Sequence, residues 1–258
     1  MNDSADRYLD WKDWHGESFA ACSPLLAAYF AAETGISASP GLRVLEIGFG
    51  NGAFIGWARS IGLEVFGVEL SPTLVARARA LLGDDRAFLT PDDPGLSKME
   101  GTFSHVVAFD VLEHIRQEDM VAFFRRICSL LAAEGRLIVR FPNGDSPFGR
   151  IYQHGDPTHV TTLGAEKLRY FSREAGLAVV TVRAPLLPLA GNRISRSVKR
   201  GLLAFGRAIV DRAVGLLYFG GRRIPLDPNY VAVLVRADTL KAATPNQRGA
   251  STDRAANA

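Results

Sequence analysis

Short apolar runs alternate with amphipathic stretches between residues 43 and 141. The apolar runs occupy 43–47, 64–68, 86–89, 104–109 and 136–141, and several of them are continuous, as expected for strands covered on both faces. The stretches between them predict helices at 53–60, 72–82 and 117–131, whereas the link 90–101 is too rich in proline and aspartate to predict one. Strands joined by helical crossovers run parallel, so the pattern predicts an α/β fold with a doubly wound, mostly parallel sheet.

The two ends of the chain depart from this alternation. Before residue 40, a helix is predicted to begin at Pro24 and to end near Gly35. Near the other end, 177–184 and 230–236 alternate like strands, and the segment between them has helical periodicity. Its apolar positions recur at steps of four and three: Val198, Leu202, Phe205, Ile209, Ala213 and Leu216. We therefore expect an N-terminal helical cap at 1–39, a main domain at 40–237 with an amphipathic helical insertion at 188–226, and a flexible tail at 238–258.

Composition adds few limits to this picture. The chain has 258 residues, of which 47% are hydrophobic, enough for one large domain. No apolar run reaches the ~18 residues that span a bilayer, and the acidic start of the chain lacks the apolar core of a signal peptide, so we expect a cytoplasmic protein. The two cysteines, Cys22 and Cys128, form no C-x-x-C pair, and neither a disulfide framework nor a zinc site is predicted.

The positive charge is concentrated in one segment. The whole chain carries +3, too little to predict nucleic-acid binding. Residues 192–223 hold eight basic residues and one acidic residue, 8 − 1 = +7, which leaves 3 − 7 = −4 for the rest. A basic amphipathic helix can cap its own domain, bind a partner such as a second copy of the chain, or lie on an anionic membrane surface. The sequence leaves these readings open; the last would place the protein peripherally at the inner membrane, beside lipid-linked molecules.

The candidate chemistry centres on the end of the first strand, which reads Glu46-Ile47-Gly48-Phe49-Gly50-Asn51-Gly52. Bare backbone at its three glycines lets a ligand approach the N-terminus of the next helix, where a side chain would push the ligand away. Glu69, after the second strand, can accept hydrogen bonds from the two hydroxyls of a ribose. The spacing also fits the G-x-G-x-x-A fingerprint of dinucleotide-binding proteins. However, Glu46 would repel a pyrophosphate and suits a cationic ligand.

This stretch resembles the first motif, E/D-x-G-x-G-x-G, of class I S-adenosylmethionine-dependent methyltransferases. About 60 residues later, Phe109-Asp110-Val111-Leu112-Glu113-His114-Ile115 is similar to the D-V-L-E-H-I/V stretch of ubiquinone-type and sugar methyltransferases. The resemblance implies a Rossmann-like, seven-stranded sheet whose antiparallel last strand lies between the fifth and the sixth. It also implies an S-adenosylmethionine site formed by Glu46, Gly48, Phe49, Gly50, Gly52, Glu69, Leu70 and Asp110.

Candidate catalytic residues follow the fifth strand, at the edge where open α/β sheets bind ligands. The loop Tyr152-Gln153-His154-Gly155-Asp156-Pro157-Thr158-His159-Val160 holds two histidines and an aspartate. Methyl transfer to a hydroxyl requires removal of its proton, and histidine titrates in the right range. We predict His159 as the base and Asp156 as the residue that orients its ring, with His154 and His114 as further candidates. The alternative is that His154 and His159 only hydrogen-bond to loop carbonyls.

Glu113 has two interpretations. It fits a stabilising charge in the first turn of a helix, or a residue that contacts the acceptor or a divalent metal ion. The sequence leaves the participation of a metal open.

The predicted reaction is O-methylation. The stretch Asp156-Pro157-Thr158-His159-Val160 looks like that of methyltransferases found with bacterial surface-polysaccharide (O-antigen-type) genes, which implies a sugar hydroxyl of a glycan or glycolipid as the acceptor. Three alternatives stay open: a small phenol or quinone precursor as the acceptor, a nicotinamide-dependent oxidoreductase, and a protein that binds the cofactor without catalysis.

Overall fold

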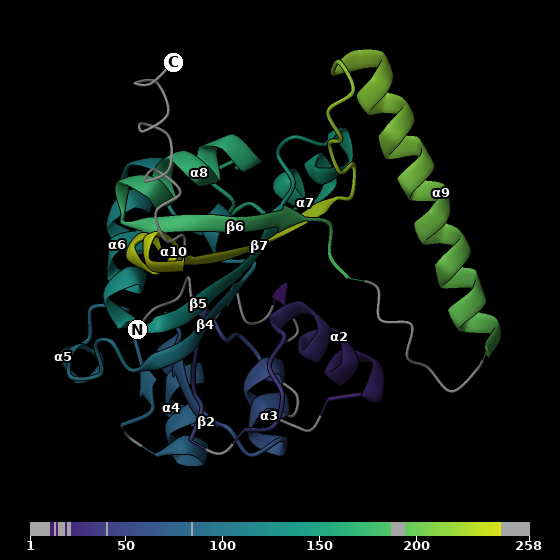
Figure 1. Cartoon of the computed structure of the whole chain (residues 1–258). Coiled ribbons are helices and arrows are strands. Elements are labelled where there is room, and N and C mark those ends of the chain that lie inside the picture. Colours follow the sequence, from purple (N-terminus) through teal and green to yellow (C-terminus); the bar gives the residue numbers. More distant parts are fainter. Residues whose placement is uncertain are drawn as a thin grey trace, which may run out of the picture.

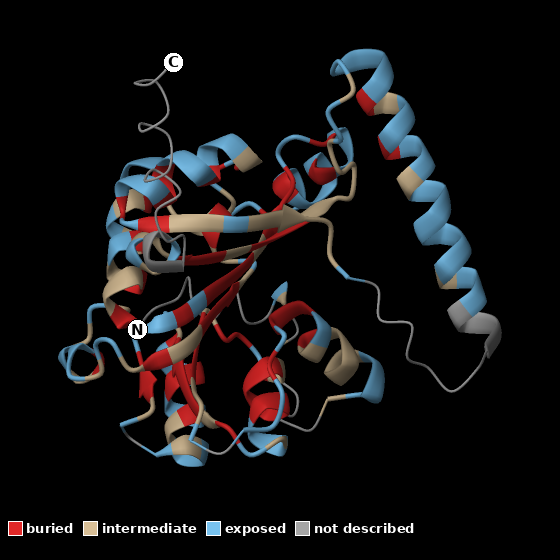
Figure 2. Ribbon diagram, viewed as in Figure 1, coloured by how far each residue is buried: buried red, intermediate tan, exposed pale blue. Residues whose placement is uncertain are grey.

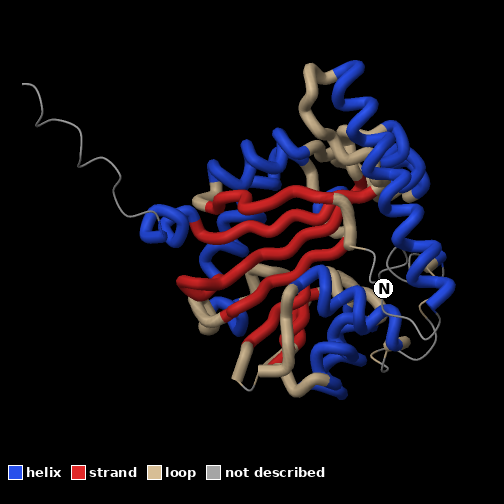
Figure 3. Tube along the Cα trace, turned by 45° about the vertical axis from the view of Figure 1, so that its right-hand side comes forward, coloured by secondary structure: helices blue, strands red, loops and turns tan. Residues whose placement is uncertain are grey.

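The computed structural model describes residues 11–12, 14, 19, 22–39, 41–83, 85–186 and 194–243. Its centre is a seven-stranded sheet with the order β3-β2-β1-β4-β5-β7-β6 (Figures 1 and 3). The strands are β1 (Arg43–Ile47), β2 (Glu64–Val68), β3 (Ala87–Phe88), β4 (Phe103–Phe109), β5 (Leu131–Pro142), β6 (Leu177–Arg183) and β7 (Asn229–Arg236). Strand β7 runs antiparallel between β5 and β6, and the remaining pairs are parallel. The predicted Rossmann-like sheet is confirmed.

Helices cover both faces of this sheet. The α-helices are α2 (Pro24–Thr34), α3 (Ala53–Ser60), α4 (Pro72–Leu82), α5 (Pro94–Ser97), α6 (Met120–Leu130), α7 (Arg150–Gly155), α8 (Ala165–Glu174), α9 (Ile194–Tyr218) and α10 (Ala237–Ala243). Helices α2, α3 and α4 lie on one face, and α6 and α8 on the other. Three-residue 3-10 turns occur at η1 (Leu112–His114), η2 (Gln117–Asp119) and η3 (Pro147–Gly149). Two sequence expectations need correction. The link 90–101 contains the single-turn helix α5, begun by Asp93, whose side chain accepts from the backbone N–H of Gly95, and the first turn of the helix expected at 117–131 is the 3-10 turn η2.

The core consists of two apolar layers, one on each face of the sheet. Adjacent residues of β1 point to opposite layers, as the two-residue period of a strand requires: Val44 packs with α2, α3 and α4, and Leu45 with α6 and α8. Buried residues occupy most positions of the central strands and the inner sides of these helices, whereas the edge strand β6 is mostly of intermediate burial (Figure 2). The order of the strands reverses between β1 and β4, so ligands are expected at the carboxyl ends of these two strands.

The chain beyond β6 differs from this compact arrangement. Helix α9 stands beside the sheet rather than on it (Figure 1). The start of the segment expected to be a flexible tail continues from β7 as α10, where the hydroxyl of Thr239 donates to the carbonyl of Ala133. Among the described helices, none combines the length and apolarity needed to cross a bilayer. Residues 1–10, 13, 15–18 and 20–21 of the predicted N-terminal cap and most of the predicted tail lie outside the described residues.

Candidate active site

The glycine loop between β1 and α3 has a left-handed backbone. Gly48, Gly50 and Gly52 have φ angles of 68°, 51° and 73°, a region that residues with a side chain rarely adopt. A Cβ at Gly48 would lie 2.6 Å from Val111, and one at Gly50 would lie 2.7 Å from the Trp14 ring. The loop therefore needs glycine for its own conformation and for the packing of this chain, and not only for a ligand as the sequence reasoning held.

The described part of the N-terminal segment lies across this loop. The ring of Trp14 faces Gly50, and the ring of Phe19 faces Gly52. The backbone N–H of Phe19 donates to the carbonyl of Asn51 at 3.0 Å. Two residues before Trp14, the Lys12 ammonium lies 3.0 Å from Asp156 in the loop after α7. Residues of the N-terminal segment thus contact both the glycine loop and the loop after α7.

Glu69 ties the end of β2 to the glycine loop. Its Oε2 accepts from the N–H of Gly50 at 2.9 Å and its Oε1 from the N–H of Ser71 at 3.2 Å. An ionised carboxylate has about four lone pairs, so Glu69 can still accept from the hydroxyls of a ribose. The next residue, Leu70, is 73% exposed and offers an apolar surface beside it.

Glu46 is a buried carboxyl group at the end of β1, next to the glycine loop. It is 5% exposed, and its Oε2 has no hydrogen-bond partner among the described residues. Burial, followed by repulsion from Glu69, raises the pKa of Glu46 well above its ordinary value. A cationic ligand would relieve both effects, so the residues fit a nucleoside that carries an ammonium and a sulfonium. The side chain of Phe49, by contrast, is buried in the core against Gly67, which leaves only its backbone to face a ligand.

Asp110 ends β4 with a strained backbone. Its φ of 57° is unusual for a residue with a side chain, and such outliers concentrate at functional sites. The guanidinium of Arg140 at the end of β5 holds its carboxylate, with Nε 2.9 Å from Oδ1, and also donates to the hydroxyl of Tyr29 at 2.9 Å. Arg140 and Tyr29 were missed from the sequence, although an arginine within an apolar strand was a usable signal.

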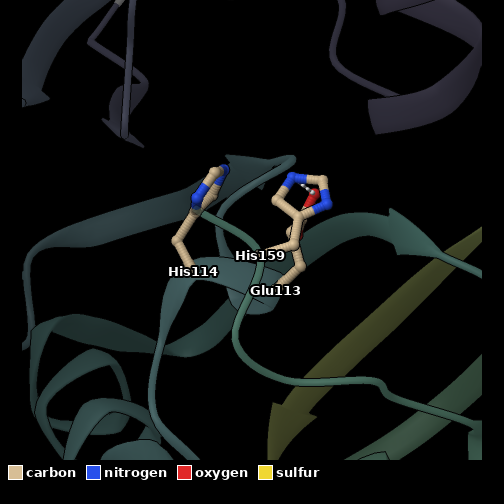
Figure 4. Close-up of side chains that lie close together, drawn as sticks. All are labelled: Glu113, His114 and His159. Atoms are coloured by element: carbon tan, nitrogen blue, oxygen red, sulfur yellow. Dashed lines mark ion pairs between the residues drawn. The ribbon is translucent and has the colours of Figure 1, made fainter. Parts of the chain in front are cut away.

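Glu113, His114 and His159 form a second cluster, at the end of β4 (Figure 4). The carbonyl of Glu113 accepts from the N–H groups of Val160 and Thr161 at 2.9 and 3.0 Å, which fixes the loop of His159 against η1. Nε2 of His159 lies 3.8 Å from Oε1 of Glu113, and the two imidazole rings are edge to face with centroids 4.6 Å apart. The structure thus brings together residues from two separate motifs.

The cluster is electrostatically unusual. Glu113 is 2% exposed, and burial, followed by repulsion from Asp110, raises its pKa to about 8. Burial, followed by repulsion from His159, lowers the pKa of His114. At pH 7 the carboxyl is therefore mostly protonated and the His114 ring is neutral. Oε2 of Glu113 and Nδ1 of His159 are buried without a hydrogen-bond partner among the described residues, so the cluster can accommodate one more polar group.

A hydrogen-bonded relay sets the tautomer of His114. Burial would raise the pKa of Asp156, but hydrogen bonds from Thr158 and the pairing with Lys12 lower it to about 2, so its carboxylate only accepts. The Thr158 hydroxyl donates its single hydrogen to Oδ1 of Asp156 at 2.5 Å. It must therefore accept from Nδ1 of His114, 3.0 Å away. Nε2 of His114 is then its accepting nitrogen.

Two sequence expectations about this loop differ from the structure. Asp156 was expected to orient His159, but its Oδ2 lies 3.7 Å from Nε2 of His159, too far for a hydrogen bond, and it acts on His114 through Thr158 instead. His154 was expected on the loop, but it lies on α7 and is exposed. No contact within the described part of the chain joins His154 to the cluster.

The same cluster could hold a divalent cation. One ligand atom from each of Glu113, His114 and His159 lies within 4.8 Å of the others. Two imidazoles and a carboxylate suit zinc, iron or manganese. Binding a cation would require Glu113 to ionise, and the charge of the cation would lower its pKa.

Comparison with known proteins gives the family. A family model described as a methyltransferase domain matches residues 14–182. A ubiquinone biosynthesis O-methyltransferase of Xanthomonas campestris pv. campestris is 29% identical over 140 residues, 52% of this chain and 56% of that protein. One of Rhodopseudomonas palustris is 32% identical over 108 residues, 40% of this chain and 41% of that protein.

This chain thus spans about half the length of the curated relatives it matches. Among solved structures, the fold is shared with a SAM-dependent methyltransferase from Archaeoglobus fulgidus, with a TM-score of 0.59 at 18% identity, covering 88% of this chain and 98% of that one. Because the matched domain extends over more than half of its residues, the chain belongs to the methyltransferase domain family, and it shares the fold of that S-adenosylmethionine-dependent methyltransferase.

Proposed function

We propose that this methyltransferase acts on a hydroxyl oxygen, and that the acceptor is a small phenol or quinone precursor. The observation that carries the proposal is the partly buried cluster of Glu113, His114 and His159, which has unsatisfied polar atoms among the described residues and lies just after β4. Family membership argues against the nicotinamide-dependent alternative, because the matched model describes methyl transfer.

Bound S-adenosylmethionine supplies an electrophilic methyl group on a sulfonium. The residues that would hold it are Glu46, Glu69 and the backbone of the glycine loop. When bound, it would supply this methyl group to the acceptor oxygen and leave as a thioether, and the proton of the acceptor hydroxyl would pass to a base of this chain. Because the leaving thioether is neutral, no acid is needed, and orientation supplies most of the rate enhancement.

The cluster contains suitable proton acceptors. The neutral ring of His114 is held by Thr158, and the ring of His159 lies beside it. Protonated Glu113 can donate a hydrogen bond to the acceptor oxygen. Phenols have a pKa of about 10, as in tyrosine, and alcohols are much weaker acids. A histidine therefore removes a phenol proton at a smaller energetic cost.

The relatives support the phenol-type acceptor. Both relatives described above are ubiquinone biosynthesis O-methyltransferases, and the residues matched by the methyltransferase domain model, 14–182, include the cluster. A sugar hydroxyl of a glycan or glycolipid remains a prediction from the loop at 156–160, and it competes directly with the phenol in the experiment below.

The test is methyl transfer from labelled S-adenosylmethionine to a panel of catechols, phenols, free sugars and glycans, each with and without a chelator. We expect turnover of a catechol or phenol. His159→Ala and His114→Ala should each lower kcat by about a hundredfold or more, as expected for loss of a general base. Their affinity for S-adenosylhomocysteine, measured by calorimetry, should stay unchanged.

His154→Ala is the matched comparison. It removes an imidazole that lies on the same stretch of chain but outside the cluster, so its kcat should change by less than about threefold, since an exposed side chain that contacts nothing reactive supplies no proton transfer. Turnover of sugars alone would replace the proposed acceptor. Equal activity of all three variants would overturn the assignment of the cluster, and binding without any turnover would favour a cofactor-binding protein. A loss of activity with chelator that manganese or zinc restores would add a metal to the site.

A further inference from the structure

Helix α9 is held to the rest of the protein only near its C-terminal end, as far as the described residues show. Asp211 accepts from the N–H of Leu226 at 3.1 Å, and Arg207 pairs with Asp227 at 2.7 Å. Gly215 packs against the backbone of Arg222. Residues 198–206 extend beside the domain, and all of them except the partly exposed Arg200 are exposed (Figures 1 and 2).

The exposed surface of α9 contains a continuous apolar stripe. Its members recur at steps of four, three, four and seven and are more than half exposed: Val198 56%, Leu202 67%, Phe205 67%, Ile209 53% and Leu216 57%. At 3.6 residues per turn, Asp211, which faces the domain, lies on the opposite side of the helix. Exposed apolar surface of this extent marks an interaction site. No described residue of the chain covers the stripe.

The charge around the stripe identifies the kind of partner. Residues 194–223 contain seven basic residues and one acidic residue, 7 − 1 = +6; three of the basic residues, Arg207, Arg222 and Arg223, lie within 4.0 Å of Asp227, Glu166 and Asp211. The acidic residue, Asp211, is 8% exposed and already accepts a backbone hydrogen bond. In a dimer joined through the stripe, Lys199 and Arg212, the basic residues nearest to the stripe, would face the partner helix without an exposed acid on either helix, and like charges oppose such pairing. An anionic lipid surface complements both the stripe and the charge.

The C-terminal end of the helix has the aromatic residues typical of a membrane–water boundary. Tyr218 is 77% exposed and Phe219 43% exposed, and amphipathic aromatic rings favour the headgroup region. The same end is tied to the sheet near the candidate active site. The side-chain amide of Asn143, directly after β5, donates to the carbonyls of Pro225 and Asp227 at 2.9 Å. A surface bound by α9 would therefore lie on the carboxyl-end side of the sheet.

We propose that α9 docks the protein onto a bilayer that contains anionic lipid, with the apolar stripe buried among the acyl chains and the basic residues at the headgroups. This orientation turns the edge that carries Glu113 and His159 toward the lipid, where an apolar acceptor would be concentrated. The docking is independent of the proposed reaction, because it depends on residues outside the candidate active site.

The experiment is co-sedimentation of the full chain with vesicles at low salt. One set contains phosphatidylcholine alone, and the other contains equal parts of phosphatidylcholine and phosphatidylglycerol. We expect at least tenfold stronger binding to the mixed vesicles, with a further decrease as salt is added. Absence of binding by the unmodified protein to the mixed vesicles would overturn the proposal.

Two triple variants separate the stripe from the charge. Leu202→Gln with Phe205→Gln and Ile209→Gln removes apolar contact, and Lys199→Glu with Arg200→Glu and Arg212→Glu reverses charge. Each should weaken binding at least tenfold. The matched control reverses three exposed arginines on other helices, Arg59→Glu, Arg125→Glu and Arg173→Glu, with the same change in net charge, and should retain most of the binding.

Unchanged circular dichroism and unchanged affinity for S-adenosylhomocysteine would show that the variants are folded, and the two triple variants test the docking separately. Equal retention of the α9 variants and the control would overturn the proposal. So would a light-scattering mass showing a dimer that the glutamine variant converts to a monomer, with no vesicle binding, because the stripe would then be an interface between two copies.

Discussion

Helices α6 and α9 carry the same kind of apolar periodicity in opposite environments. Met120, Phe124 and Ile127 of α6 are completely buried, whereas Leu202 and Phe205 of α9 are both 67% exposed. Helix α6 crosses from β4 to β5 and so returns over the sheet. Helix α9 is inserted between β6 and β7. On one face of the sheet, these two strands are already covered by α6 and α8. Periodicity therefore predicts that a helix has an apolar face, but the topology decides what covers that face.

The largest expected effect tests this contrast directly. Phe124→Ala removes a fully buried ring and should lower the free energy of unfolding by about 3–5 kcal/mol. Phe205→Ala removes the same ring from an exposed position and should change it by less than about 0.5 kcal/mol in the absence of lipid. Urea denaturation measures both values. Similar losses for the two variants would show that α9 belongs to the folding core and that the contrast is wrong.

The parts of the fold that the sequence predicted are those with a long repeat. Strand runs, the crossover helices and the turn at Gly48–Gly52 follow from patterns that extend over five or more residues. Helix α5 and the 3-10 turns have only one turn each. Such short elements depend on local hydrogen bonds and leave no repeat in the sequence. The inserted helix was predicted as an element, but its surroundings depend on contacts that are distant in sequence.

The candidate site shows the same division. The carboxyl ends of strands meet at one edge, so the sequence could place Glu46, Glu69 and Glu113 there. The relay from Asp156 through Thr158 to His114 could not be predicted, because it joins residues 44 positions apart through side-chain rotamers. The hydrogen bond from Arg140 to Tyr29 could not be predicted either, because the two residues are 111 positions apart in the sequence. His154 was misplaced because α7 is too short to show helical periodicity.

The second prediction concerns the buried carboxyl group of Glu113. In the folded protein the pKa of Glu113 is raised to about 8, so the folded state holds this proton more tightly than the unfolded state. The free energy of unfolding must then fall as pH rises from the unfolded pKa near 4.3 through about 8. Glu113→Gln removes this penalty. We expect the variant to match the unmodified protein near pH 5 and to exceed it by on the order of 2–4 kcal/mol near pH 8.5.

Thermal unfolding across this pH range, with no metal or cofactor added, measures the effect. Glu118→Gln is the matched control, because Glu118 is 69% exposed on the neighbouring turn and should leave the pH dependence unchanged. If Glu113→Gln and Glu118→Gln gave parallel curves, Glu113 would be ionised in the folded protein at neutral pH. Its assignment as a hydrogen-bond donor to the acceptor would then be wrong.

The smallest expected effect lies where α9 meets the domain. Arg207, 53% exposed, pairs with Asp227 at 2.7 Å, and a pair with an exposed partner contributes about 0.2–1 kcal/mol. Burial nevertheless raises the pKa of Asp227, and Arg207 only partly offsets this, so the cost of burying the carboxylate cancels most of the gain. Asp227→Asn keeps the shape and should change the free energy of unfolding by less than about 0.5 kcal/mol, with little dependence on salt. A loss of several kcal/mol in urea denaturation would mean that this ion pair fixes α9 rigidly to the domain. The fold itself would then fix the position of the exposed stripe. A small change in the free energy of unfolding would mean that this ion pair attaches α9 only weakly to the domain, in contrast to the buried α6.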